Sequence, residues 1–216
     1  MKKKIKLFDL IIGNEEEKSV INVLKSHFWA SGSGEGHVQE FENEFKNYVN
    51  SHDCIAVNSG TSALHISCLS LGLKKNDIAW TSPISFVASA NCALLSNATI
   101  DFVDIDPNTY NISVTELKNK LIKAKKNNKL PKVLIVVHLA GLPCDMYEIY
   151  LLSKKYKFNI IEDASHAINA WYKGNRIGNC KYSQITIFSF HAVKIITSGE
   201  GGIAITNSRK LAINLP

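Results

Sequence analysis

Residues 189–202 read SFHAVKIITSGEGG and hold a single lysine, Lys194, among apolar and small residues. The β-branched runs on either side predict strands at 184–190 and 202–206, so Lys194 lies in the connection between two strands. Burial lowers the pKa of a lysine, and a neutral lysine is the nucleophile that forms a Schiff base with an aldehyde. The alternative is a surface lysine whose ammonium group stays in water. Three other stretches of the chain favour the nucleophile.

Short strands and helices alternate from residue 54 to residue 161. This alternation predicts an α/β fold, in which a mostly parallel sheet has helices on both faces and right-handed crossovers. Ligands of such open sheets bind beyond the carboxyl ends of the strands. The strands at 184–190 and 202–206 complete a sheet of seven. The other expected strands are 54–57, 78–81, 100–103, 133–137 and 158–161, and the expected helices are 61–71, 85–96, 113–125 and 145–156.

Residues 1–50 are expected to form an N-terminal helical segment. Asn14 followed by Glu17 is typical of an N-cap with its capping-box partner, and predicts a helix that continues to about Ser26. A glycine-rich loop with an aromatic pair follows at 28–36. The next helix should have its apolar residues on one face, namely Val38, Phe41, Phe45, Tyr48 and Val49.

The composition excludes several classes of protein. The net charge of +6 comes from scattered lysines, without the basic stripe and interleaved aromatics that nucleic-acid binding needs. The five cysteines have no C-x-x-C spacing, so we expect reduced thiols, no metal site and a cytoplasmic location. The uncharged run 78–100 is long enough to cross a bilayer, but its proline, asparagines and serines favour a strand, a loop and a packed helix. No membrane association is expected.

Residues 58–65, NSGTSALH, follow a predicted strand and open a predicted helix. Small residues allow a ligand to approach the backbone, and the start of a helix offers free N–H groups and the positive end of its dipole. The hydroxyls of Thr61 and Ser62 would add donors, and the whole set suits one phosphate. The stretch lacks the second glycine and the lysine of a Walker loop. An ordinary Ser/Thr helix cap is the alternative.

Two further side chains come directly after predicted strands. Phe86 offers a ring that can stack on a flat heteroaromatic ligand, with core packing as the alternative. Asp163 ends a buried strand and needs a cationic or donor partner. That partner can be the protonated pyridine nitrogen of pyridoxal phosphate, while a helix N-cap or a buried salt bridge would be structural. The order of phosphate cup, stacking ring, carboxylate and lysine is the layout of fold type I pyridoxal phosphate enzymes.

The chain resembles the DegT/DnrJ/StrS sugar aminotransferases from about Ile5 to its end. The segments EDASHA at 162–167 and SFHAVK at 189–194 are most similar to members that act on UDP-4-keto-6-deoxy-N-acetylhexosamines in pseudaminic acid synthesis. The resemblance implies a cytoplasmic homodimer with pyridoxal 5'-phosphate, a nucleotide-sugar substrate, glutamate as amino donor and a part in polysaccharide synthesis. The matching residues are Phe41-Glu42, 58–65, 81–83, 86–89, 162–167, 189–194 and 199–202.

The resemblance also implies a role for each site residue. Lys194 would bind the cofactor aldehyde and move the proton between substrate and cofactor, while Asp163 would keep the pyridine nitrogen protonated. Phe86 would stack on the ring, and His166, where many relatives carry Gln, would lie near the ring hydroxyl. The phosphate would be held by the hydroxyls of Thr61, Ser62 and Ser189. Further candidates, for contact with the sugar or nucleotide, are Phe8, Trp29 and His191.

Members of the family continue beyond the length of this sequence. By resemblance, residues 1–216 are expected to be one cofactor-binding large domain, incomplete at its C-terminal end and without the small C-terminal domain. Such a chain alone should be aggregation-prone and largely inactive, because part of an apolar face is left uncovered. Two other functions stay open. One is a cofactor-dependent sugar dehydratase, although relatives of that kind carry His in place of the lysine, and the other is a truncated, non-catalytic binding module.

Overall fold

The computed structural model describes residues 10–29 and 36–215, which divide into two compact units with the boundary between Phe41 and Glu42. In the first unit, α1 (Asn14–Ser26) has no buried residue. The Gly13 N–H donates to Glu16 Oε2 at 2.7 Å, so the helix cap lies one residue before the predicted pair Asn14 and Glu17. The helix itself has the expected length, because the shift changes only which carboxylate reaches back to the free N–H group.

The boundary between the two units falls within α2 (His37–Val49), after Phe41. From Glu42 onward, α2 belongs to the second unit and buries Phe45 and Val49 there, as its apolar spacing predicts. The Phe45 ring packs edge-on against Phe188, with ring centroids 5.3 Å apart. This contact holds the second half of α2 against the sheet.

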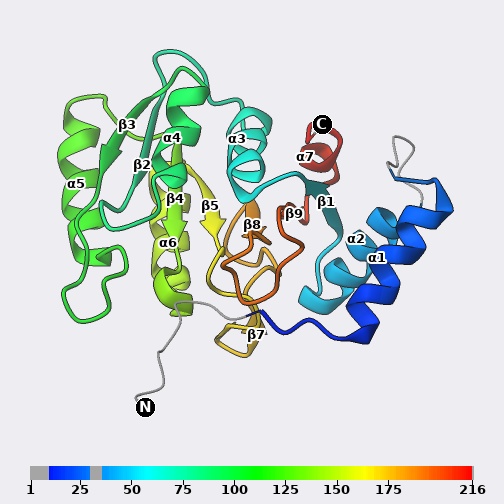
Figure 1. Cartoon of the computed structure of the whole chain (residues 1–216). Helices are drawn as coiled ribbons and strands as arrows, with labels where there is room; N and C mark the ends of the chain where they lie inside the picture. The colour runs from blue at the N-terminus through cyan, green and yellow to red at the C-terminus, as the bar shows by residue number, and fades with distance from the viewer. Residues whose placement is uncertain (1–9, 30–35, 216) are drawn as a thin grey trace. The chain divides into compact units, whose positions relative to one another are not determined.

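The second unit is built on a seven-stranded sheet in the order β1-β9-β8-β5-β4-β2-β3 (Figure 1). Strands β2, β3, β4, β5 and β8 run parallel to one another, and β9 runs antiparallel to both β1 and β8. The predicted α/β fold with a mostly parallel sheet is confirmed. The strands are β1 (Asp53–Val57), β2 (Ile78–Thr81), β3 (Thr99–Phe102), β4 (Val133–Val137), β5 (Asn159–Asp163), β8 (Ile185–Ser189) and β9 (Gly202–Thr206).

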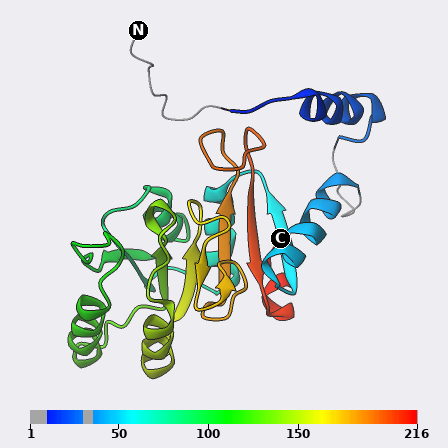
Figure 2. The same ribbon diagram turned by 90° about the horizontal axis from the view of Figure 1, so that it is seen from below.

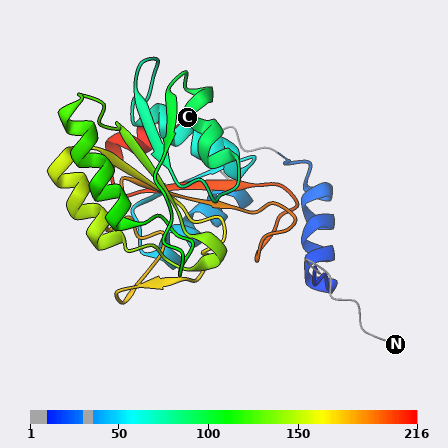
Figure 3. The same ribbon diagram turned by 90° about the vertical axis from the view of Figure 1, so that its left-hand side faces the viewer.

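Helices cover both faces of this sheet, and the central strand β4, VLIVV, is therefore buried along its whole length. Val133 and Ile135 point to the side of the sheet that is covered by α3 (Gly60–Ser70), α4 (Ala88–Leu95) and α7 (Arg209–Ile213). Leu134 and Val136 face α5 (Val114–Lys126) and α6 (Met146–Tyr156), which lie together on the other side (Figure 3). Side chains that alternate along one strand thus fill two separate cores.

The structure corrects two predicted boundaries near the carboxyl ends of the strands. Helix α4 begins at Ala88 rather than at Ser85, so Phe86 lies in the connection before the helix. Strand β5 continues to Asp163 rather than ending at Ile161, because residues 162 and 163 are paired with β4 and β8. Two short elements were not predicted, the 3-10 turn η1 (Leu139–Gly141) and the hairpin of β6 (Trp171–Tyr172) with β7 (Asn175–Arg176).

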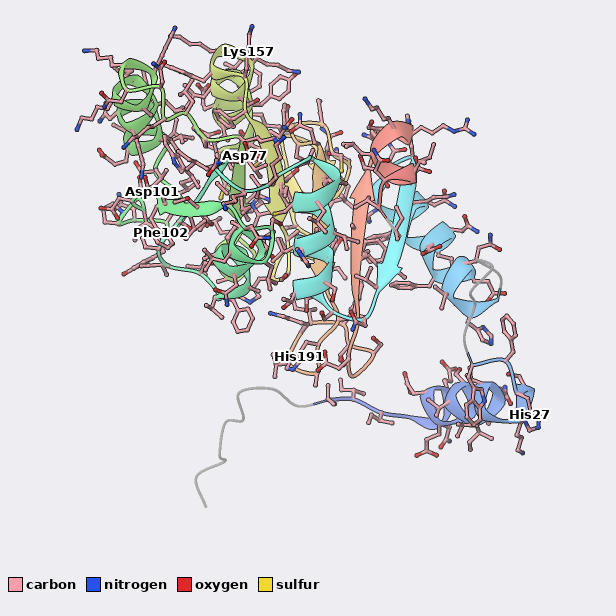
Figure 4. The ribbon with its side chains drawn as sticks, turned by 90° about the horizontal axis from the view of Figure 1, so that it is seen from above. His27, Asp77, Asp101, Phe102, Lys157 and His191 are labelled. Carbon is pink, nitrogen blue, oxygen red and sulfur yellow. The ribbon has the colours of Figure 1, made fainter. Side chains whose placement is uncertain are left out.

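The uncharged run 78–100 forms β2, a connection, α4 and the start of β3, as predicted. Across residues 10–29 and 36–215, no helix combines the length and the apolar character needed to span a membrane. The outer strand β3 carries Asp101 and Phe102, both labelled in Figure 4. Lys120 forms an ion pair with Asp101 at 2.7 Å and donates to the carbonyl of Phe102, so a lysine partly covers this edge of the sheet.

The connection from β8 to β9, residues 190–201, extends beyond the ends of these two strands (drawn in orange in Figure 2). Two hydrogen bonds anchor its base, from Phe190 N–H to the Gly201 carbonyl at 2.8 Å and from Ser198 N–H to the Phe190 carbonyl at 3.1 Å. Lys194 lies in the middle of this loop in the sequence. His191, which is labelled in Figure 4, lies near its beginning. The loop therefore overhangs the carboxyl end of β8, where ligands of such sheets bind.

Candidate active site

A cavity of about 530 Å³ lies where the carboxyl ends of β5 and β8 meet the start of α3. It combines backbone from the helix start, an aromatic ring, a carboxylate, an imidazole and an amine. Its polar and aromatic lining consists of Ser59, Gly60, Thr61, Ser85, Phe86, Asp163, Ser165, His166, Ser189, His191, Lys194 and Glu200.

Most of the predicted site residues line this one cavity, namely Thr61, Phe86, Asp163, His166, Ser189, His191 and Lys194. Ser62, in the first turn of α3, does not line it, because its hydroxyl donates to Asn58 Oδ1 at 2.6 Å. Ser59, which the sequence interpretation left out, faces the cavity in its place. Trp29 belongs to the first unit, where its indole N–H donates to the Leu24 carbonyl at 3.2 Å. Phe8 lies outside the described residues.

The start of α3 is held close to Ser189 of β8. A Cβ atom added to Gly60 would lie 2.7 Å from the Ser189 Cβ, a distance that real side chains do not reach, so only glycine permits this approach. Ser59 caps the helix by accepting from the Ser62 N–H at 3.1 Å. The N–H groups at Gly60 and Thr61 belong to the first turn, which has no intrahelical acceptors for them. The hydroxyl-bearing residues Ser59, Thr61 and Ser189 and the start of α3 at Gly60 thus line the same cavity. Their three hydroxyls and the N–H groups of Gly60 and Thr61 suit an anion.

Asp163 is buried, with 4% of its surface exposed, on the face of β5 that lines the cavity. Its Oδ1 accepts from Ser165 N–H at 3.1 Å and from Ser165 Oγ at 2.7 Å. Its Oδ2 accepts from Ser89 Oγ at 2.6 Å. A buried carboxylate needs hydrogen-bond donors, and these three hold it in one orientation.

The pKa values of Lys194 and His166 are both lower in this cavity than in water. Burial lowers the pKa of Lys194, and the negative charge of Asp163 opposes that change. Burial also lowers the pKa of His166, and the charge of Lys194 lowers it further, while Asp163 again acts in the opposite direction. The His166 Nδ1 atom is buried and has no hydrogen-bond partner among the described residues. The site therefore offers an amine whose pKa burial lowers and an imidazole nitrogen that has no partner among the described residues.

Phe86 is 66% exposed at the edge of the cavity, so core packing does not explain its position. The connection from β2 to α4 carries it there without a regular element of its own. An exposed aromatic ring over a cavity that also contains a carboxylate and an amine is suited to stack on a flat ring.

Sequence reasoning missed a second polar cluster on the opposite face of β5. Glu162 accepts from His138 Nε2 at 2.9 Å and from Thr186 Oγ1 at 3.2 Å, and all three residues are buried. The Cys144 N–H donates to His138 Nδ1 at 3.1 Å, which leaves Nε2 as the nitrogen that donates to Glu162. The alternation of Glu162 and Asp163 within one strand is the only sequence signal for it. Among the described residues, no group of three or more His, Cys, Asp and Glu side chains could hold a metal ion.

Residues 10–215 match the family model described as the DegT/DnrJ/EryC1/StrS aminotransferase family. The chain belongs to this aminotransferase family. Membership is confirmed as predicted, and the family depends on pyridoxal phosphate. The UDP-4-amino-4,6-dideoxy-N-acetyl-beta-L-altrosamine transaminase of Campylobacter jejuni is 40% identical over 174 residues, which cover 81% of this chain and 44% of that protein. The chain spans about half the length of the curated relatives it matches.

Solved structures of the aminotransferase family show the same fold. Helicobacter pylori PseC, described as an aminotransferase involved in the biosynthesis of pseudoaminic acid, matches with a TM-score of 0.84 and 28% identity, over 99% of this chain and 55% of that one. Bacillus subtilis NtdA with bound cofactor PMP matches with a TM-score of 0.80 and 27% identity, over 100% of this chain and 48% of that one. The fold of this chain, predicted to be the large domain of a fold type I aminotransferase, is therefore the fold that these family members share.

The cavity fits the family's cofactor on three observations. The close approach at Gly60 forms a cradle of N–H and hydroxyl donors for a phosphate. The orphaned His166 Nδ1 can bond a ring substituent, and the buried carboxylate of Asp163 can accept from a ring nitrogen. Lys194 supplies the amine that an aldehyde requires.

Proposed function

We propose that the protein transfers an amino group, from glutamate, to the 4-keto carbon of a nucleotide-linked 6-deoxy sugar, with pyridoxal 5'-phosphate as cofactor. The observation that carries this proposal is the pairing of a buried, hydrogen-bonded Asp163 with a partly desolvated Lys194 in one cavity. A binding module has no need of that pair. Family relatives named as a nucleotide-sugar transaminase and as a spore coat polysaccharide biosynthesis protein support a role in surface glycan synthesis. We further propose, from the family resemblance, that the enzyme works in the cytoplasm as a homodimer.

The phosphate would bind at the start of α3. Its oxygens would accept hydrogen bonds from the N–H groups of Gly60 and Thr61 and from the hydroxyls of Ser59, Thr61 and Ser189. The positive end of the helix dipole would add to the attraction of a dianion. Ser62 takes no direct part in this set, because its hydroxyl is bonded to Asn58. Its contribution is to complete the cap that holds Ser59 in place.

When bound, the cofactor supplies an aldehyde for the amino group and a ring that withdraws electrons. Asp163 would hold the proton on the ring nitrogen, since its ionised carboxylate is the natural acceptor for a cationic N–H. Phe86 would cover one face of the ring, and His166 would bond the ring hydroxyl through Nδ1. Lys194 Nζ would take a proton from the substrate carbon and pass it to a carbon of the cofactor. Burial favours this role because it lowers the pKa of Lys194.

The sugar and the amino donor would enter at the mouth of the cavity. His191 Nε2 and Glu200 Oε1 lie 3.6 Å apart there, both largely exposed, and either can bond a hydroxyl or an amino group. Phe8 and Trp29 remain candidates for contact with the sugar or nucleotide on the strength of the family resemblance.

Borohydride trapping tests the cofactor chemistry directly. The full-length protein is mixed with pyridoxal 5'-phosphate, reduced with borohydride and mapped by mass spectrometry. We expect one labelled lysine, Lys194, and no label in Lys194→Arg, while Asp163→Asn should still be labelled but should transaminate orders of magnitude more slowly. Label on another lysine of the wild type, or wild-type turnover by Asp163→Asn, would refute these assignments.

A panel of 4-keto nucleotide sugars, with glutamate as amino donor, tests the substrate class. Transfer of nitrogen to a UDP-linked 6-deoxy-N-acetylhexosamine is the expected reaction. Loss of water from the sugar without transfer of nitrogen would identify a dehydratase instead, and product analysis by mass spectrometry separates the two by the mass gained or lost.

A further inference from the structure

Ser89 is a fully buried residue in the first turn of α4 whose hydroxyl reaches across to β5. Its Oγ donates to Asp163 Oδ2 at 2.6 Å, a contact between residues 74 positions apart in the chain. It also accepts from Ser85 Oγ at 2.9 Å, and Ser85 lines the cavity. A chain of hydroxyls thus runs from the rim of the cavity to the carboxylate.

Other buried helical serines of this protein behave differently. Ser67 Oγ donates to the Ala63 carbonyl at 2.6 Å, and Ser96 Oγ donates to the Cys92 carbonyl at 3.0 Å. Each bonds the backbone one turn earlier in its own chain segment, which is the usual solution for a serine in a helix. Ser89 instead gives its only proton to a side chain on a strand.

The acceptor positions of Asp163 show what this bond does. An ionised carboxylate has about four lone-pair positions, two on each oxygen. Ser165 occupies both on Oδ1, through its N–H and its hydroxyl, and Ser89 occupies one on Oδ2. Among the described residues these are the donors that reach the carboxylate, so the remaining position is on Oδ2.

We propose that Ser89 is a positioning residue for the reaction inferred above, which orients Asp163 so that Oδ2 receives the N–H of the cofactor ring. This inference rests on the proposed function. Because Ser89 donates to Oδ2, this oxygen is held as an acceptor, so the shared proton stays on the ring nitrogen rather than moving to the carboxylate. Ser85 strengthens the effect because it polarises the Ser89 hydroxyl.

Removal of the Ser89 hydroxyl should therefore make the bound ring less positive. A less positive ring repels a proton on Lys194 Nζ less strongly, so that proton should leave at a higher pH. Besides Asp163, the titratable groups around Lys194 in the cavity are His166, His191 and Glu200, whereas the side-chain hydrogen bonds of Ser89 are to Ser85 and Asp163. The pH at which the visible absorbance of the bound cofactor changes reports this proton.

The test compares Ser89→Ala with Ser67→Ala, an equally buried serine on α3 that bonds only backbone. In the full-length protein, Ser89→Ala should raise the midpoint of the absorbance titration by about one pH unit and lower kcat about tenfold to a hundredfold. The dissociation constant of the cofactor should change less than about threefold, since the phosphate contacts are untouched. Ser67→Ala should leave the midpoint and kcat at their wild-type values.

Two further variants separate positioning from folding. Ser89→Thr keeps the hydroxyl and should restore the wild-type midpoint. Ser85→Ala, at a half-buried position, should shift the midpoint in the same direction as Ser89→Ala but less. If Lys194 of the wild type is trapped by borohydride and Ser89→Ala titrates like the wild type, the role of Ser89 is refuted while the proposed function stands. If no cofactor is trapped at Lys194 of the wild type, the role of Ser89 and the proposed function are both refuted.

Discussion

Gly202 of β9 lies against the backbone of the loop that opens α3, and its replacement by alanine tests the phosphate cradle. A Cβ at this position would lie 2.4 Å from the carbonyl carbon and oxygen of Ser59 and 2.6 Å from the Gly60 nitrogen. Ordinary contacts of a Cβ begin at 3.4 Å, so the two segments would have to separate by about 1 Å. Both partners are backbone, and neither can rotate away.

The sheet leaves little freedom for that separation. Gly202 is paired with Val57 of β1 on one side and with Ser189 of β8 on the other, so the displacement falls on the Ser59–Gly60 loop. Overpacking of this kind costs about 1–3 kcal/mol of unfolding free energy, and each kcal/mol lowers Tm by about 2–4 °C in a protein of this size. Loss of one hydrogen bond to the phosphate, worth about 1.5–3 kcal/mol, weakens cofactor binding about tenfold to a hundredfold.

Circular dichroism melts and a titration with pyridoxal 5'-phosphate, followed by absorbance, measure both effects for Gly202→Ala. The control is Gly174→Ala, in the turn between β6 and β7, where a Cβ meets nothing within 4 Å although φ is +76°. This variant should lose about 1 kcal/mol through backbone strain and keep the wild-type affinity for the cofactor. Wild-type stability and wild-type cofactor affinity in Gly202→Ala would show that the loop does not depend on this close approach.

Three further predictions concern charge and protonation. Because burial lowers the pKa of Lys194 below 10.5 despite the charge of Asp163, its acylation in the cofactor-free protein should reach half-maximum below pH 10.5, as peptide mapping would show. A half-maximum at or above that pH would contradict the burial. Burial alone would raise the pKa of Asp77, but the hydrogen bond from Lys132 at 2.7 Å lowers it below 3.8. The ion pair therefore stabilises the fold above pH 3.8, and this stabilisation is lost as pH falls through the lower pKa of the folded state. Asp77→Asn should therefore cost up to about 1 kcal/mol in urea unfolding at pH 7, with a difference from wild type that shrinks in acid, and a constant difference would refute the ion pair. Burial raises the pKa of the Cys180 thiol to about 12, so a disulfide reagent at pH 8 should modify it only after unfolding, and rapid reaction of the native protein would be the contrary result.

Local pattern was enough to predict most of the secondary structure. The strands at 78–81, 133–137 and 202–206 have the predicted ends, because each is a run of apolar residues bounded by turn-forming or polar residues. Where prediction and structure differ, pairing with neighbours overrode the local signal. Residues 162 and 163 stay extended because Val136 and Val137 on one side and Thr186 and Ile187 on the other complete their ladder.

The sequence by itself determined the kinds of chemical group and the order in which they occur after the strands: the small residues before α3, Phe86, Asp163 and Lys194. Tertiary structure decided how these groups are used. It bonded the Ser62 hydroxyl to Asn58 and put the helix cap Ser59 in the cavity wall. It also brought Ser89 to Asp163 from 74 residues away, and placed β9 antiparallel between β1 and β8 so that Gly202 supports the loop at Ser59. Periodicity reports which face of one element is apolar. It contains no information on the distance between two polar atoms on different elements, and that distance decides which hydroxyl bonds the carboxylate.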